Sequence, residues 1–156
     1  MTQKHSFTLF ADYHQFYLQD EAVGGDLSEA WTPDAVDRLL ALAPGVIGVG
    51  TVRNIDVPVE LEILSHPPQD DLTAWDRVNE CSIRFTSGRA VIAGCTDYFP
   101  DAARIPIAPG DYRVRVYYGD LSSLSSDVLE GNDHYRIVLW PASEGPVVRI
   151  KSPDIT

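Results

Sequence analysis

Strict alternation of apolar and polar residues is the feature that most limits what this chain can fold into. From Val57 to Ile63 an apolar side chain stands at every second position, with Pro58, Glu60 and Glu62 between them. Successive side chains of a β-strand point to opposite faces, so this period of two buries one face and leaves the other in water. The segment therefore predicts a strand in a sheet that is covered on one side.

The same signal recurs along the chain and predicts a mainly β fold. Short strands at close spacing, with turns such as Pro109-Gly110-Asp111, favour a single-domain antiparallel two-sheet β-sandwich; a flattened barrel is the alternative. The chain has 156 residues, 44% of them hydrophobic, and no linker or repeat, so we expect one domain over residues 1–156. About eight strands are expected, at 6–18, 46–53, 57–63, 81–85, 89–95, 112–118, 135–139 and 147–150.

The sequence also predicts one interruption of a strand and one helix. In the first expected strand the apolar face changes phase near His14-Gln15, which predicts a bulge or a break. One short helix is expected near residues 33–43, with Thr32 as N-cap and Pro33 at the first helical position. The apolar stripe for this helix ends before Pro44-Gly45, a pair that stops helices.

Thr86-Ser87-Gly88 separates two expected strands and predicts a tight hairpin. One register of that hairpin places Cys81 opposite Cys95, and a loop one residue shorter does not. Two cysteines are too few for a disulfide framework, so both are interpreted as buried thiols.

A block of motifs in the first third of the chain carries a family resemblance. Asp12-Tyr13-His14-Gln15-Phe16 is followed by Trp31-Thr32-Pro33, by Pro44-Gly45-Val46-Ile47 and by Arg53-Asn54. In this order and spacing the block resembles the competence-protein-J (ComJ-like) bacterial nuclease inhibitors, and weaker likeness continues through 57–64 and 109–112. The resemblance implies inhibition of a DNA-degrading enzyme by direct binding. The chain looks longer than that family around 119–133 and in the C-terminal strands.

The charge balance restricts the partners. The net charge is −11, from 23 acidic and 12 basic residues, and a surface this negative repels nucleic acid and anionic membranes. A protein partner with a basic surface is favoured, while solubility alone is the simpler reading of the acidity. No apolar run is long enough to span a membrane and the N-terminus lacks the apolar core of a signal peptide, so a cytoplasmic location is expected.

Two acidic segments without basic residues are the candidate partner-binding sites. One extends from Asp20 to Glu29 and the other from Gly119 to Asp133. Together they could form a negative patch that docks on a basic cleft, or they could be ordinary solvated loops. The partner-binding candidates are Asp20, Glu21, Asp26, Glu29, Asp120, Asp127, Glu130 and Asp133.

No catalytic or cofactor motif accompanies these segments. The four histidines have no second His or Cys at metal-ligand spacing, and nucleophile elbows and phosphate loops are absent. The sequence thus predicts no catalytic residue, no metal, no cofactor and a binding protein rather than an enzyme. The alternatives are a small-ligand binder or enzyme with a pocket at one end of the sandwich near His14 or His134, and a scaffold without a site.

Overall fold

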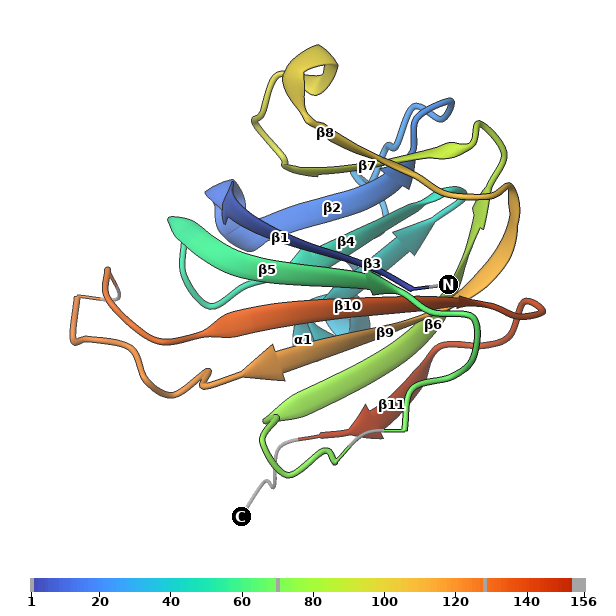
Figure 1. Ribbon diagram of the computed structural model, residues 1–156. Coiled ribbons are helices and arrows are strands. Elements are labelled where there is room, and N and C mark those ends of the chain that lie inside the picture. The colour runs from blue at the N-terminus through green and yellow to red at the C-terminus, as the bar shows by residue number, and fades with distance from the viewer. Residues whose placement is uncertain (1, 70, 128, 153–156) are drawn as a thin grey trace.

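The chain folds into two packed β-sheets in the computed structural model, which describes residues 2–69, 71–127 and 129–152 (Figure 1). The expected mainly β, two-sheet architecture with one short helix is confirmed, with eleven strands in the described residues. The strands are β1 (Gln3–Phe10), β2 (Gln15–Asp20), β3 (Leu40–Ala43), β4 (Val46–Gly50), β5 (Asp56–Ile63), β6 (Arg77–Phe85), β7 (Arg89–Gly94), β8 (Ala103–Pro106), β9 (Gly110–Gly119), β10 (His134–Pro141) and β11 (Val148–Lys151).

The two sheets differ in strand direction. The six-stranded sheet has the order β1-β5-β10-β9-β6-β11, and the five-stranded sheet has the order β3-β4-β2-β7-β8. The smaller sheet is antiparallel throughout, whereas β5 and β10 pair in parallel in the larger one. The expectation of a purely antiparallel fold is therefore wrong at this pair. Both sheets are open, so they do not close into the alternative barrel.

The break expected near His14-Gln15 moves the chain from one sheet to the other. β1 ends at Phe10, the 3-10 turn η1 (Asp12–His14) follows, and β2 begins at Gln15 in the opposite sheet. Tyr13 and His14 have φ angles of 57° and 59°, in the left-handed region that residues with a Cβ rarely occupy. The predicted first strand is thus two strands joined by a strained turn.

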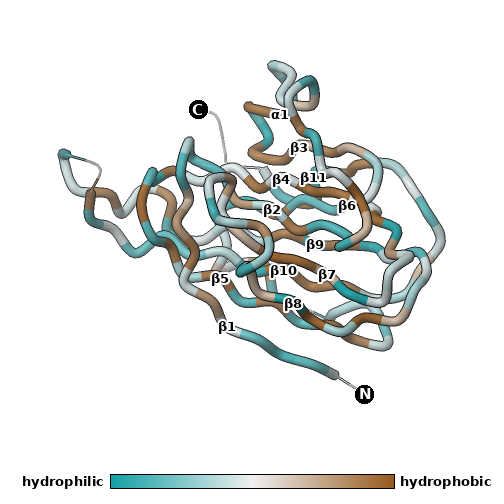
Figure 2. The backbone as a smooth tube through the Cα atoms, turned by 90° about the horizontal axis from the view of Figure 1, so that it is seen from above, coloured by the Kyte–Doolittle hydropathy of each residue, from teal (hydrophilic) through white to brown (hydrophobic). Residues whose placement is uncertain are grey.

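The core lies between the sheets and is built from the alternating apolar faces. Tyr135 of β10 packs edge-on against Phe16 of β2 and against Tyr118 of β9, with ring centroids 5.9 and 6.0 Å apart. All three side chains are buried. Burial of such apolar area supplies most of the driving force for folding. Figure 2 shows hydrophobic stretches running along the strands of both sheets.

The helix begins as predicted and ends early. Thr32 caps α1 (Pro33–Arg38) by accepting a hydrogen bond from the Ala35 amide at 3.2 Å. Leu39 then adopts a φ of 62°, and the next four residues form β3 instead of another helical turn. The apolar residues expected to extend a helical stripe to Ala43 therefore belong partly to a sheet edge.

The predicted hairpin at Thr86–Gly88 is a crossover between sheets. β6 lies in the six-stranded sheet and β7 in the five-stranded sheet, so neither proposed register forms. Cys81 faces Val114 of β9 and is buried, which raises the pKa of its thiol to about 12. Cys95 is half-buried, so the expectation of two buried thiols holds only for Cys81.

The outer face of the six-stranded sheet pairs its charges. Glu80 of β6 binds Arg113 and Arg115 of β9, with N–O distances of 3.0 and 2.9 Å. Arg136 of β10 binds Glu62 of β5 at 2.9 Å. Neighbouring strands bring these opposite charges side by side, and such cross-strand pairs stabilise a sheet modestly. The charges on this face are therefore engaged within the protein.

Candidate functional site

Four connections gather at one end of the sandwich, where β9 ends and β10 begins (Figure 1). We call this region the loop end. It consists of residues 12–14, 51–55, 95–102 and the described residues of 120–133. The described residues of these segments contain seven acidic residues and one arginine. Parts of two motifs that carry the family resemblance lie here, namely Tyr13-His14 and Arg53-Asn54.

Hydrogen bonds join the first three connections. The Cys95 thiol donates to the Asp12 carbonyl at 3.3 Å, and the Thr96 hydroxyl donates to the Asp12 carboxylate at 2.9 Å. On the other side of the turn, the His14 amide donates to the Asn54 side-chain oxygen at 3.3 Å. The strained η1 turn is therefore held between the β7–β8 and β4–β5 connections.

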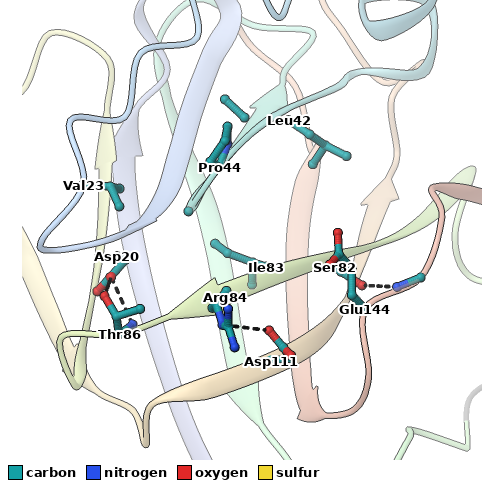
Figure 3. Close-up of a pocket in the computed structure, with 13 residues that line it drawn as sticks. Asp20, Val23, Leu42, Pro44, Ser82, Ile83, Arg84, Thr86, Asp111 and Glu144 are labelled. Atoms are coloured by element: carbon teal, nitrogen blue, oxygen red, sulfur yellow. Dashed lines mark hydrogen bonds and ion pairs between the residues drawn. The ribbon is translucent and has the colours of Figure 1, made fainter.

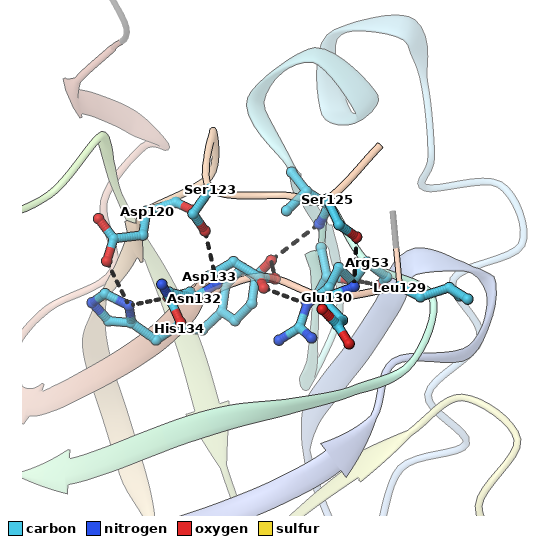
Figure 4. Close-up of polar contacts among 12 residues, drawn as sticks. Arg53, Asp120, Ser123, Ser125, Leu129, Glu130, Asn132, Asp133 and His134 are labelled. Atoms are coloured by element: carbon cyan, nitrogen blue, oxygen red, sulfur yellow. Dashed lines mark hydrogen bonds and ion pairs between the residues drawn. The ribbon is translucent and has the colours of Figure 1, made fainter. Parts of the chain in front are cut away.

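A buried ion pair ties down the fourth connection (Figure 4). Arg53 Nε lies 2.5 Å from Asp133 Oδ1, and Asp133 is fully buried. The Tyr135 hydroxyl donates to the other Asp133 oxygen at 2.7 Å and accepts from the Val52 amide at 3.0 Å. Burial, and then the neighbouring carboxylate, raise the pKa of Tyr135, so the hydroxyl stays protonated and donating. This network attaches the end of the β9–β10 connection to the core.

The exposed part of the β9–β10 connection is shaped by its own side chains. Asp127 accepts from the Ser125 hydroxyl at 2.5 Å and from the Leu129 amide at 3.1 Å. The Ser123 hydroxyl accepts from the Asn132 amide at 2.7 Å, which draws the two sides of the connection together. These bonds to Asp127 lower the pKa of its carboxyl, so it is ionised at neutral pH.

Large apolar side chains are also exposed at the loop end. Tyr13 and Tyr98 are each 70% exposed and Leu129 is 58% exposed. Tyrosine is among the residues enriched in protein-binding hot spots, and the rim of such an interface is polar. The exposed acidic residues of the loop end are Asp97, Asp101, Asp120, Asp127 and Glu130.

Backbone strain is concentrated in the same place. Four residues other than glycine have positive φ in the described part of the chain, and three of them, Tyr13, His14 and Asp120, belong to the loop end. Such conformations cost roughly 1–3 kcal/mol each and persist where the surrounding structure enforces them. They occur often at binding sites, so strain adds to exposure and charge in marking this end.

The first acidic segment starts at the other end of the sandwich. Figure 1 shows it leaving β2 opposite the loop end, so Asp20 and Glu21 lie apart from the second segment. Asp20 is fully buried there and accepts hydrogen bonds from the amide and hydroxyl groups of both Thr86 and Ser87. Its interactions fix the crossover between β6 and β7, so its side chain is unavailable to a partner.

The other three acids of this segment are partly engaged. Glu21 binds Arg104 at 2.8 Å and lies 3.9 Å from Arg89. Asp26 accepts from the Ser28 amide at 2.9 Å, and Glu29 is exposed. Of the eight predicted partner-binding residues, the loop end contains Asp120, Asp127, Glu130 and Asp133, and Asp133 is buried.

The histidines are placed apart from the larger described pocket. His134 lies against the Trp75 ring, with centroids 5.1 Å apart, while His14 belongs to the η1 turn. A pocket of about 530 Å³ opens at the opposite end, between β3 and β6 (Figure 3). Neither histidine lines it, so this pocket differs from the one expected near them.

Metal-binding clusters and membrane-spanning helices are both absent from the described residues. These residues contain no group of three or more His, Cys, Asp and Glu side chains that could hold a metal ion. Within the same ranges, no helix is long and apolar enough to cross a membrane.

The fold and the loop end together define a two-sheet β protein whose most exposed features are carried on connections at one end. Two solved structures share this fold. One is ComJ from Bacillus subtilis, inhibitor of the DNA degrading activity of NucA, with a TM-score of 0.72 and 17% identity over 91% of this chain and 99% of ComJ. The other is described as crocagin biosynthetic gene J, with a TM-score of 0.64 and 22% identity over 92% of this chain and 99% of that one.

At these identities the likeness establishes a shared fold, and the ComJ-like resemblance found in the sequence motifs is confirmed at that level. No family model and no curated protein sequence matches the chain.

Sequence reasoning missed the contribution of the β7–β8 connection. Asp97, Tyr98 and Asp101 stand between strands that looked unrelated to the acidic segments. Nothing in their local pattern separates them from an ordinary turn, because their role depends on which end of the sandwich they reach. Tyr13 carried a signal, since it directly precedes the change of phase at His14-Gln15 in the first expected strand.

Proposed function

We propose that this chain is a binding protein that inhibits a DNA-degrading nuclease by covering a basic surface of it with the loop end. The observation that carries the proposal is the joint exposure of Tyr13, Tyr98 and Leu129 at the same end of the sandwich as five exposed acids, none of which is ion-paired with a lysine or arginine among the described residues. In this proposal the chain acts by binding alone and performs no catalytic step.

Electrostatics favour a nuclease as the class of partner. An enzyme that cuts DNA presents cationic residues to a polyanion. Carboxylates at the loop end can be attracted by the same positive electrostatic potential. The exposed acids on two of the connections supply that negative charge, Asp97 and Asp101 on one and Asp120, Asp127 and Glu130 on the other, and the half-buried Asp12 of η1 adds to it. Complementary charge of this kind mainly accelerates association and selects the partner.

The exposed apolar residues supply the contact that holds the complex. Truncation of a buried interface aromatic typically costs 2 kcal/mol or more, roughly thirtyfold in affinity, whereas rim charges change affinity less. Tyr13 is suited to this role because the η1 turn is fixed on both sides by hydrogen bonds, so its backbone loses little conformational freedom when a partner covers it.

The shared fold supports the proposal without deciding it. ComJ is an inhibitor of a DNA-degrading activity, and a protein described as a crocagin biosynthetic gene product has the same fold. A fold can carry unrelated functions, so the chemistry of the loop end is what favours inhibition here.

A DNA-degradation assay tests the function. The purified chain is added to lysate of its source cells, and cleavage of linear double-stranded DNA is followed with and without it. We expect a dose-dependent fall in cleavage, relieved at high salt, and co-purification of the inhibited nuclease with the chain. Unchanged cleavage at a large molar excess of the chain would contradict inhibition. Tyr13→Asn, which leaves the core intact, is the matched variant and should inhibit poorly.

A further inference from the structure

One half of β6 lacks a strand neighbour on its outer side. β9 pairs with β6 over its whole length, from Arg77 to Phe85. On the other side β11 pairs only with Val78, Asn79 and Glu80. Among the described residues, the backbone from Cys81 to Phe85 therefore has a single strand neighbour and presents a sheet edge.

The chain leaves this edge open for an identifiable reason. Pro146 precedes β11 by two residues, and its carbonyl accepts a hydrogen bond from Arg113 on the outer face of the sheet at 2.9 Å. Gly145 donates to the Ser82 hydroxyl at 3.0 Å on the same face. Proline has no amide hydrogen to give to a sheet, and here the segment contacts side chains on the outer face at Ser82 and Arg113 instead of pairing with the edge.

The first half of β6, at Arg77–Asn79, is covered by the end of the helix α1. Asn79 donates to the Arg38 carbonyl at 2.7 Å, and Arg77 donates to the Asp37 carbonyl at 2.7 Å. The C-terminal end of α1 thus closes the gap between the sheets over Arg77–Asn79. No described element does the same over Ser82–Phe85, and the 530 Å³ pocket opens there.

The pocket lies between two strand edges (Figure 3). Leu42 and Pro44 stand on the side of β3, itself an edge strand, and Ile83 and Arg84 stand on β6. The lining combines an apolar floor with three acids and one arginine: Asp20, Asp111, Glu144 and Arg84. Arg84 is engaged by Asp111 at 3.3 Å, and Asp20 by Thr86 and Ser87, so Glu144 is the charge left to meet a ligand.

We propose that this groove binds an extended segment of a partner protein, which adds a strand to the free edge of β6 at Cys81–Phe85. Main-chain hydrogen bonds to an edge supply affinity in such complexes, and pockets for alternate side chains supply selectivity. Five residues of β6 span about 17 Å at ~3.4 Å per residue, enough for a segment of about five residues. The floor of Leu42 and Ile83 takes apolar side chains at alternate positions, and Glu144 favours a lysine or arginine between them.

This site is independent of the proposed nuclease interface, because it occupies the opposite end of the sandwich and its test uses no nuclease. The probe is the capped peptide acetyl-Val-Lys-Val-Lys-Val-Lys-amide, titrated into isotope-labelled protein and followed by NMR. We expect shifts at Leu42 and Cys81–Phe85, together with slowed hydrogen exchange at alternate amides of that part of β6. Shifts confined to other residues, or none at millimolar peptide, would overturn the proposal.

Two controls separate strand addition from charge attraction. The same peptide with alternate backbone amides N-methylated keeps its charge and loses donors, so it should bind at least about tenfold more weakly. Glu144→Lys should weaken the unmodified peptide roughly two- to fivefold, while Glu60→Lys, an exposed change on β5, should leave it unaffected. Equal binding of the methylated and unmodified peptides, or equal loss in both variants, would show that the groove does not add a strand.

Discussion

The two acidic segments look alike in sequence and differ in the folded protein. In the first, Asp20 is buried under four hydrogen bonds and Glu21 is paired with two arginines. In the second, one acid is buried and three are exposed at the loop end, the end of the sandwich that also carries Tyr13 and Tyr98. Charge counted along a sequence therefore does not measure charge available to a partner. The availability of a carboxylate to a partner depends on whether the fold supplies a hydrogen-bond donor or a cation for it.

The largest effect should come from the buried member of the second segment. Asp133→Ala leaves the Arg53 guanidinium buried without its carboxylate and removes the acceptor of the Tyr135 hydroxyl. Breaking a buried pair from one side costs about 3–5 kcal/mol, so the urea midpoint should fall sharply. Glu130→Ala, in the exposed part of the same connection, should change the free energy of unfolding by less than about 0.5 kcal/mol. Similar losses in both variants would contradict the division between buried and exposed acids.

Tyr13→Asn should affect binding more than folding. Asparagine tolerates the left-handed conformation found at φ 57°, so we expect stability to stay within about 1 kcal/mol of the wild type. Removal of the aromatic ring should weaken nuclease binding by about 2 kcal/mol or more, measured by calorimetry. An unchanged affinity would show that Tyr13 is not part of the interface.

Asp20→Asn tests the structural role of the first segment and has a defined pH dependence. Burial opposes ionisation of Asp20, but the hydrogen bonds from Ser87 and Thr86 outweigh it and lower the pKa below 3.8. The stabilisation is therefore complete above the unfolded pKa of about 3.9 and is lost as the pH falls through the lower folded value. We expect the variant to be about 1–3 kcal/mol less stable at pH 7.

The stability difference between wild type and Asp20→Asn should narrow as the pH falls below about 4, measured by urea unfolding across that range. A difference that stays constant or widens in acid would show that the ionised carboxylate is not what fixes the crossover between β6 and β7.

The sequence predicted the strands better than their arrangement. Alternation at Val57–Ile63 and the cap at Thr32 depend on neighbouring residues, so both were correct. The hairpin at Thr86–Gly88 was wrong because a short turn and a crossover between sheets have the same local composition. The helix ended early because Leu39 adopts the left-handed conformation, and no glycine stands there to indicate the end in the sequence.

The site was predicted in part for the same reason. Asp120, Asp127 and Glu130 were named from charge alone, and the fold places them at the same end of the sandwich as exposed aromatics. Asp20 and Asp133 were named on the same basis and are buried, since their hydrogen-bond donors come from residues 66 and 80 positions away. Tyr98 reaches the loop end only through the path of β7 and β8.

The association rate with the nuclease is the most direct test of the loop end as the binding surface. Two variants remove three acids each: Asp120→Asn with Asp127→Asn and Glu130→Gln, and Glu21→Gln with Asp26→Asn and Glu29→Gln. Stopped-flow rates are measured from low to high salt. We predict that the first variant associates about tenfold more slowly at low salt, with a flatter salt dependence, while the second follows the wild type. Equal rates and salt dependences for the two variants would contradict the account.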